Sequence, residues 1–236
     1  VFFRKGSFFM NHEKLSGILK TVSKPGRYTG GEFGQIIKDK SSVSVRFAFC
    51  FPDTYEIGMS NLGVRILYEA LNRAPSVWCE RVYAPWTDMD AKMKEYGIPL
   101  TAHESGDPLT EFDIVAFTLQ YELCYTTALQ MLKLAGIPLY SKDRGESDPI
   151  ILAGGPCVYN AEPVADFFDL INIGEGEEVL LEISYITGWE GNTTITWGDG
   201  GRVYVPAAKF DGVKAGAKIR FYYTQKDQTW AQAHRP

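Results

Sequence analysis

Three short apolar runs of the sequence are each followed by polar residues and glycines that could bind a ligand. The candidate cofactor-binding residues in these groups are Asp53, Tyr55, Gly58 and Ser60, then Thr118, Leu119 and Gln120, then Gly154, Gly155 and Pro156. Glycine lets a ligand approach the backbone closely, and the N-terminus of a following helix favours a phosphate or another anion. A Gly-Gly pair after a strand is also common in ordinary turns, so the prediction depends on the three groups occurring together.

The elements that must position these residues alternate between short buried strands and amphipathic helices. The sequence predicts strands at 43–51, 78–83, 112–119, 150–153 and 170–173, and helices at 13–22, 62–72, 88–96, 125–135 and 177–183. A short helix or turn is predicted at 161–168. Such alternation is typical of an α/β fold with a Rossmann-like, doubly wound parallel sheet. Ligands bind such sheets at the carboxyl ends of the strands, and all three groups lie at predicted strand ends.

The ends of the predicted helices can also be assigned from residue types. We expect residues 53–58 to form a loop, and Ser60 or Asn61 to cap the helix that follows. Asp88 is a good N-cap for the next helix, and Gly97 is a good residue for its C-terminal end.

The composition changes twice along the chain. Residues 1–42 form a polar N-terminal segment in which Met10 is a plausible start, and residues 43–183 form the predicted Rossmann-like domain. Residues 184–236 alternate aromatic and β-branched residues with polar ones, with glycine-rich turns between them, as in antiparallel β structure. We therefore expect a short antiparallel β tail, which is either a native extension or a foreign fusion.

Charge and composition exclude several classes of protein. The net charge of -5 and the isoelectric point near 5.3 argue against a non-specific nucleic-acid binder. No apolar run is long enough to cross a bilayer, and residues 1–9 lack the features of a secretory signal. The four cysteines are widely scattered without the CxxC spacing of a zinc or redox site. We expect reduced thiols in a cytoplasmic protein, with no metal site and no catalytic group. His12, His103 and His234 are isolated, and we expect them at the surface.

The order of the three groups resembles the cobalamin-binding (B12-binding) domain at the N-terminus of B12-type radical SAM proteins. The usual pattern is Asp-x-His-x-x-Gly, then Ser-x-Leu, then Gly-Gly, where this sequence has Asp53 to Gly58, Thr118 to Gln120 and Gly154-Gly155. Longer stretches are also similar to one bacterial family of such proteins, of uncharacterised reaction: KPGRYxGGE from Lys24, FPDxYEIGMS from Phe51, APWxDM from Ala84, LQYEL from Leu119, AGGPC from Ala153 and GEGE from Gly174. The resemblance covers residues 15–183.

The resemblance implies cobalamin as a cofactor and a radical SAM barrel as the downstream partner domain. This sequence differs from the family pattern in two respects. Tyr55 occupies the position of the histidine that binds cobalt, and a phenol is a poor cobalt ligand beside an imidazole. The Cys-x3-Cys-x-x-Cys motif that holds a 4Fe–4S cluster for S-adenosylmethionine is absent from the sequence. We therefore expect both of those cofactors only in the missing downstream domain, and a chain that is not catalytic alone.

Two alternatives remain open at this point. The chain could be a degenerate module of the same fold that binds a substrate or partner without a cofactor, which the presence of Tyr55 favours. Residues 187–233 also resemble the first strands of β-sandwich modules in secreted glycan-handling bacterial proteins. A carbohydrate-binding module is therefore the third interpretation, and it ranks last because the first 183 residues have a cytoplasmic character.

Overall fold

The computed structural model describes residues 15–173, 193–196 and 202–205. Its centre is a five-stranded sheet in the order β2-β1-β3-β4-β5, in which every neighbouring pair is parallel. The strands are β1 (Val45–Phe51), β2 (Val77–Tyr83), β3 (Ile114–Thr118), β4 (Ile150–Gly154) and β5 (Leu170–Ile171). The predicted α/β fold with a Rossmann-like parallel sheet is therefore confirmed.

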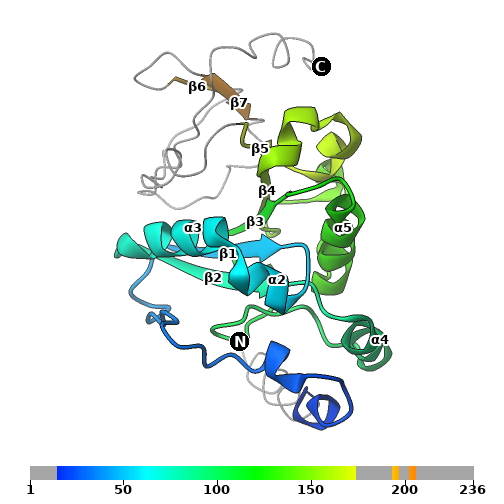
Figure 1. Cartoon of the computed structure of the whole chain (residues 1–236). Helices are drawn as coiled ribbons and strands as arrows, with labels where there is room; N and C mark the ends of the chain where they lie inside the picture. Colours follow the sequence, from blue (N-terminus) through cyan, green and yellow to red (C-terminus); the bar gives the residue numbers. More distant parts are fainter. Residues whose placement is uncertain (1–14, 174–192, 197–201, 206–236) are drawn as a thin grey trace.

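Helices cover the sheet on both faces (Figure 1). On one face lie α2 (Tyr55–Ser60) and α3 (Leu62–Arg73), and on the other lie α4 (Thr87–Tyr96) and α5 (Cys124–Ala135). Phe47 and Phe49 of β1 pack with Tyr68 of α3, because alternate residues of a strand point to the same face. This arrangement follows from the chain reversing direction across the sheet after β2, with right-handed crossovers on each side.

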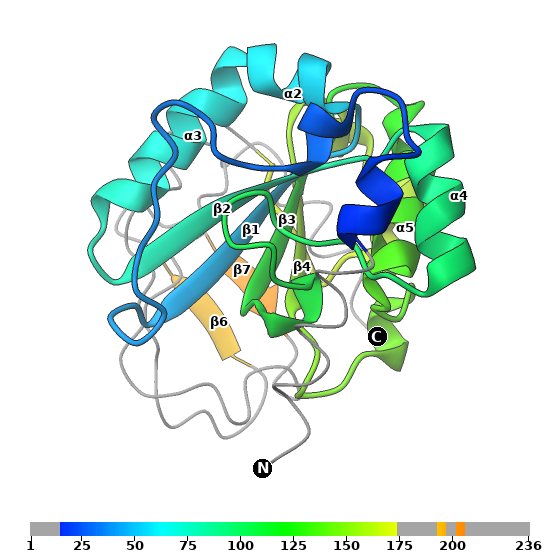
Figure 2. The same cartoon turned by 90° about the horizontal axis from the view of Figure 1, so that it is seen from below.

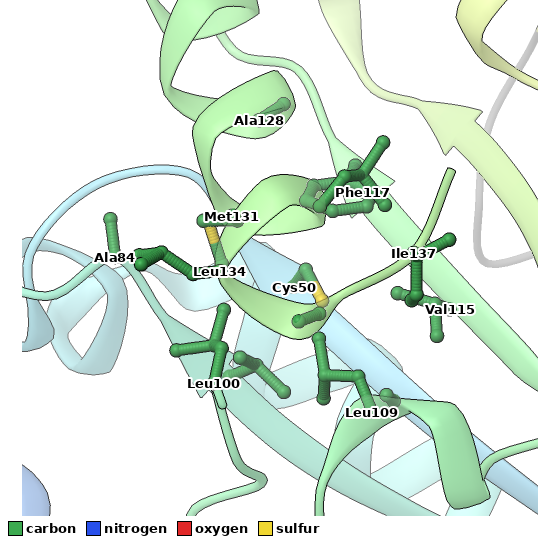
Figure 3. Packing of buried hydrophobic residues seen from close by; sticks show 14 of the residues in the cluster. Cys50, Ala84, Leu100, Leu109, Val115, Phe117, Ala128, Met131, Leu134 and Ile137 are labelled. Atoms are coloured by element: carbon green, nitrogen blue, oxygen red, sulfur yellow. The ribbon is translucent and has the colours of Figure 1, made fainter. Parts of the chain in front are cut away.

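The larger of the two cores lies between the sheet and α5. Met131 of α5 is fully buried and packs with Val115 and Phe117 of β3 and with Cys50 of β1 (Figure 3). Burial of side chains of this size contributes roughly 1.5–3 kcal/mol each. The core therefore fixes the carboxyl ends of β1 and β3 relative to each other.

The helix ends agree in part with the residue types. Asn61 caps α3 as predicted, since its Oδ1 accepts a hydrogen bond of 3.0 Å from the Val64 backbone N–H. Gly97 follows α4 with a φ of 63°, again as predicted. The N-cap assignment of Asp88 was wrong: α4 begins at Thr87, and the Asp88 carboxylate accepts hydrogen bonds from Ser23 instead.

The predicted loop at residues 53–58 was also wrong in part. The chain turns into the helix α2 directly after Thr54, and the Gly58 N–H donates to the Thr54 carbonyl over 3.0 Å. Glycine within a short polar segment weakens any helical signal. The helix forms because Gly58 lets it approach the Tyr83 ring, a contact made by a distant strand.

Residues 15–40, here called the N-terminal strap, lie along the β2 side of the sheet (Figure 2). Residues 15–19 are helical, and the 3-10 helix η1 (Pro25–Tyr28) follows. Ile18 and Val22 are buried in the larger core, and the Ile36 backbone bonds to Tyr68 of α3. The strap therefore belongs to the same packed body as the sheet.

Short 3-10 helices complete the connections. They are η2 (Leu109–Glu111), η3 (Ser141–Asp143), η4 (Pro156–Asn160) and η5 (Glu162–Phe167). The strands β6 (Thr193–Thr196) and β7 (Arg202–Val205) pair antiparallel. The rest of the expected β tail and the expected helix at 177–183 lie outside the described residues. Within the described ranges, no helix has the length and apolar character needed to cross a membrane.

Candidate ligand site at the carboxyl edge of the sheet

The sheet has a topological switch point between β1 and β3. From β1 the chain crosses to β2 on one side, whereas β3 lies on the other side and leads outward to β4 and β5. The segments that leave β1 and β3 therefore diverge at their carboxyl ends. In open α/β sheets with this strand order, ligands bind outside the carboxyl ends of the strands at the switch point.

Asp53 and Tyr121 lie on opposite sides of the switch point and bond to each other. The Tyr121 hydroxyl donates to Asp53 Oδ2, and the Thr54 N–H donates to Asp53 Oδ1 over 2.6 Å. The hydrogen bond to Asp53, together with partial burial, raises the pKa of Tyr121 to about 12. Tyr121 is therefore a neutral hydrogen-bond donor at pH 7, and the pair connects the segments that follow β1 and β3.

The second and third predicted groups meet at the ends of β3 and β4. The Leu119 N–H donates to the Gly154 carbonyl over 2.7 Å, and the Cys157 N–H donates to the Leu119 carbonyl over 3.0 Å. The Gln120 side-chain amide donates to the Thr118 hydroxyl over 2.6 Å. The Leu119 side chain is fully buried in the larger core. Only the backbone of Leu119 could therefore contact a ligand at this edge.

The two adjacent glycines of this edge have different surroundings. Gly155 has a φ of +97°, and a Cβ there would lie 2.8 Å from the Leu119 carbonyl oxygen. A Cβ on Gly154 would meet only Asn172 among the described residues, at 4.0 Å. Gly155 is therefore needed by the fold, whereas a side chain at Gly154 would make only ordinary van der Waals contact. Pro156 begins η4 directly afterwards.

The remaining predicted residues, on α2, face a different part of the molecule. A Cβ on Gly58 would lie 2.4 Å from the Tyr83 ring, so this glycine is needed for helix packing. The Tyr55 ring lies 5.5 Å from the Tyr83 ring and 5.4 Å from the His103 ring, measured between centroids. The Ser60 hydroxyl donates to the Ile57 carbonyl of its own helix over 2.9 Å.

Tyr55, Tyr83 and His103 line a cavity of about 60 Å³ beside the end of β2. Glu32 of the strap closes the group, since its Oε1 lies 3.0 Å from His103 Nε2. Burial and hydrogen bonding to Glu32 raise the pKa of Tyr55 to about 12, so its phenol stays protonated at neutral pH. A protonated phenol that is already bonded to a carboxylate is not available as a cobalt ligand.

The sequence analysis did not predict four residues of these sites: Glu32, Tyr83, His103 and Asn172. His103 was predicted at the surface, but its side chain is only 6% exposed. Its partner Glu32 is 71 residues away in sequence, so no local pattern could have shown the pair. Asn172, beside Gly154, had no signal except its place at the end of a predicted strand.

Comparison with known proteins identifies the family of this chain. Residues 63–195, more than half of the chain, match the family described as radical SAM proteins, N-terminal. The chain belongs to this family. The match includes the second and third groups of the edge, and it excludes the strap and the segment from Asp53 to Ser60.

The radical SAM N-terminal domain also has a relative in an archaeon. An uncharacterized protein of Methanocaldococcus jannaschii is 29% identical over 141 residues, which cover 58% of this chain and 26% of that protein. The chain therefore spans about a quarter of the length of the curated relative that it matches.

The cysteines of this radical SAM N-terminal domain are all free thiols. Cys50, Cys79 and Cys124 are buried and Cys157 is half-buried. Burial raises the pKa of Cys50 and Cys79 well above the usual value of a thiol. Within the described parts of the chain, no three histidine, cysteine, aspartate or glutamate side chains come together as a metal site.

Proposed function

We propose that this chain is a cobalamin-binding-type domain in the N-terminal part of a cytoplasmic radical SAM enzyme. The observation that carries the proposal is the placement of Asp53, Thr118 and Gly154 at the carboxyl ends of three adjacent strands around the switch point. Membership of the radical SAM N-terminal family supports a radical SAM barrel as the partner domain. In that enzyme the barrel would supply the 4Fe–4S cluster and S-adenosylmethionine, and this domain would be non-catalytic alone.

The residues of the edge fit cobalamin as a ligand held without a protein bond to cobalt. Thr118 and Gln120 offer polar groups at the end of β3, and the lack of a side chain at Gly154 would let a ligand approach the backbone. Asp53 and Tyr121 would have to separate for a ligand to bind between the segments that follow β1 and β3. When bound, cobalamin would supply organocobalt chemistry such as methyl transfer, and the residues of this chain would bind and orient it.

A second function, a cofactor-free module that binds a substrate or partner, has its own support. Gly58 and Gly155 are explained by contacts within the protein, and Tyr55 is turned into the cavity beside β2. These glycines would therefore be kept in a domain that had lost its cofactor. The carbohydrate-binding alternative depends mainly on residues outside the described ranges.

A titration of the purified chain with hydroxocobalamin, read by visible absorbance and by retention on a desalting column, tests the proposal. We expect stoichiometric retention by the wild-type chain. Gly154→Leu should weaken binding at least about tenfold, or ~1.4 kcal/mol, because its side chain would block the approach of the ligand to the backbone. Gly145→Leu is the matched control. Gly145 is exposed and precedes β4, and a Cβ built there would have no described heavy atom of another segment within 4 Å.

Absence of retention by a chain that is folded by circular dichroism would rule out cobalamin binding and favour the cofactor-free module. Equal retention by the wild type and Gly154→Leu would place the ligand elsewhere on the molecule.

A further inference from the structure

Asn172, at the end of β5, is a buried amide with an unused hydrogen-bond acceptor. Asn172 is 8% exposed, and its Oδ1 atom has no hydrogen-bond partner among the residues that the structure describes. Asn72 of α3 is 7% exposed and is fully bonded: its Nδ2 donates to the Tyr68 and Cys79 carbonyls, and its Oδ1 accepts from the Cys79 N–H. An unpaired acceptor costs free energy when it is buried, so Asn172 is unusual and requires an explanation.

The position of Asn172 connects it to the edge already described. Thr118 pairs with Gly154 in the register of β3 and β4, and the register of β4 and β5 places Asn172 next to Gly154. The Asn172 N–H also donates to the Ala153 carbonyl over 2.7 Å. Thr118, Gly154 and Asn172 therefore form a row at one level across three strands.

All three residues of this row point to the same face of the sheet. Ile114 and Ala116 of β3 belong to the core on the α3 side, and Thr118 has the same parity along its strand. Gly154 shares the parity of Ile150 and Leu152, which are only partly buried against that core. The row spans two strand spacings, or about 10 Å, and its central position carries no side chain.

The chemistry of the row is that of an amide-binding site. Asn172 offers a carbonyl acceptor that the fold leaves unpaired, Thr118 offers a hydroxyl, and Gly154 permits close approach between them. The buried acceptor matches a ligand N–H donor, such as that of a carboxamide.

We infer that Asn172 is a ligand-binding residue whose Oδ1 accepts a hydrogen bond from a carboxamide of the ligand at this edge. The inference rests on the proposed function, because the corrin ring of cobalamin carries carboxamides around its periphery. It adds a fourth strand end to the three that the sequence pattern identified.

Substitution by leucine, which has a similar size and no acceptor, separates the two uses that this amide could have. The melting temperature of the ligand-free chain and its affinity for hydroxocobalamin are measured for the wild type, Asn172→Leu and the matched control Asn72→Leu. We expect Asn72→Leu to lower the melting temperature by several degrees, since it leaves backbone groups unpaired. Asn172→Leu should leave the melting temperature unchanged or raise it, and should weaken hydroxocobalamin binding at least about tenfold.

Asn172→Ala provides a second variant that removes the acceptor without adding volume. A fall in melting temperature for both Asn172 variants, as large as that of Asn72→Leu, would overturn the inference because the chain itself would be using the amide. Undiminished hydroxocobalamin binding by both variants would overturn it while leaving the proposed function intact. Failure of the wild type to bind hydroxocobalamin would contradict the proposed cofactor, and the melting temperatures alone would then decide whether the acceptor is free.

Discussion

Gly154 and Gly155 show at the scale of single residues that one sequence pattern can serve two purposes. Gly155 has a positive φ, and a Cβ at this position would collide with the Leu119 backbone. A glycine is therefore needed for the segment after β4 to pack against the end of β3. Gly154 has an ordinary backbone conformation, and a Cβ there would make only ordinary van der Waals contact with Asn172. The Gly-Gly signal therefore combines a structural requirement with a feature of the candidate site.

This difference predicts opposite effects of two neighbouring substitutions. Gly155→Ala should destabilise the domain by about 2 kcal/mol, because the added Cβ meets backbone and the left-handed conformation is strained. Gly154→Ala should change stability by less than about 0.5 kcal/mol, since its Cβ makes only ordinary contact. Urea denaturation of both variants measures the difference, and equal effects of the two substitutions would contradict this assignment.

Residue types predicted which residues reach the carboxyl edge of the sheet, but they did not predict the contacts of their side chains. Asp53, Thr118 and Gly154 reach the carboxyl edge because the strand periodicity and the helix signals fix the order of the elements. The surroundings of Tyr55 could not be predicted, because Glu32 and His103 come from the strap and from the segment before β3. Side-chain partners that far apart in sequence leave no periodic signal.

The N-terminal strap is the element whose role changes most between sequence and structure. Its polar composition predicted a loop that leads to the sheet, yet it is tied to the body along its length. The Arg27 and Lys24 side chains bond to Glu56 Oε1 over 2.9 and 3.2 Å, and Glu32 bonds to His103. Because β2 is an edge strand, a strap along this side also shields it from pairing with other chains.

Acid should weaken the attachment of the strap. Hydrogen bonds from Arg27 and Lys24 lower the pKa of Glu56 to about 2. Burial raises the pKa of Glu32, but hydrogen bonds from His103 and Tyr55 outweigh that effect and lower it. A folded-state pKa below the unfolded value stabilises the fold above the unfolded pKa, and this contribution is lost as the pH falls through the folded pKa.

The double variant Glu32→Gln/Glu56→Gln tests this account of the strap. It should be less stable than the wild type at pH 6, and the difference should shrink as the pH falls from about 4.5 to 2, as both carboxyl groups of the wild type become protonated. Urea denaturation at a series of pH values gives the two curves. A stability difference that is constant with pH would show that the two carboxylates act only through their shape.

At the scale of the whole molecule, the alternation of elements was enough to predict the fold. The parallel sheet follows because each predicted strand is separated from the next by a helix or a long crossover. The helix α2 was missed because Gly58 lowers the local helix propensity, while the packing that compensates comes from Tyr83 of β2. The order of the strands and helices was therefore predictable from the sequence. The helix α2 was not, because it depends on a contact with a distant strand.

The central claim is that a ligand binds at the carboxyl edge formed by β1, β3, β4 and β5. The most direct test is an amide NMR spectrum of the wild-type chain, recorded with and without hydroxocobalamin. We predict that the largest shift changes fall on Thr118 to Tyr121, on Gly154 and Gly155, and on Asn172. Changes concentrated on Tyr55, Tyr83 and His103, or no changes at saturating hydroxocobalamin, would contradict the claim.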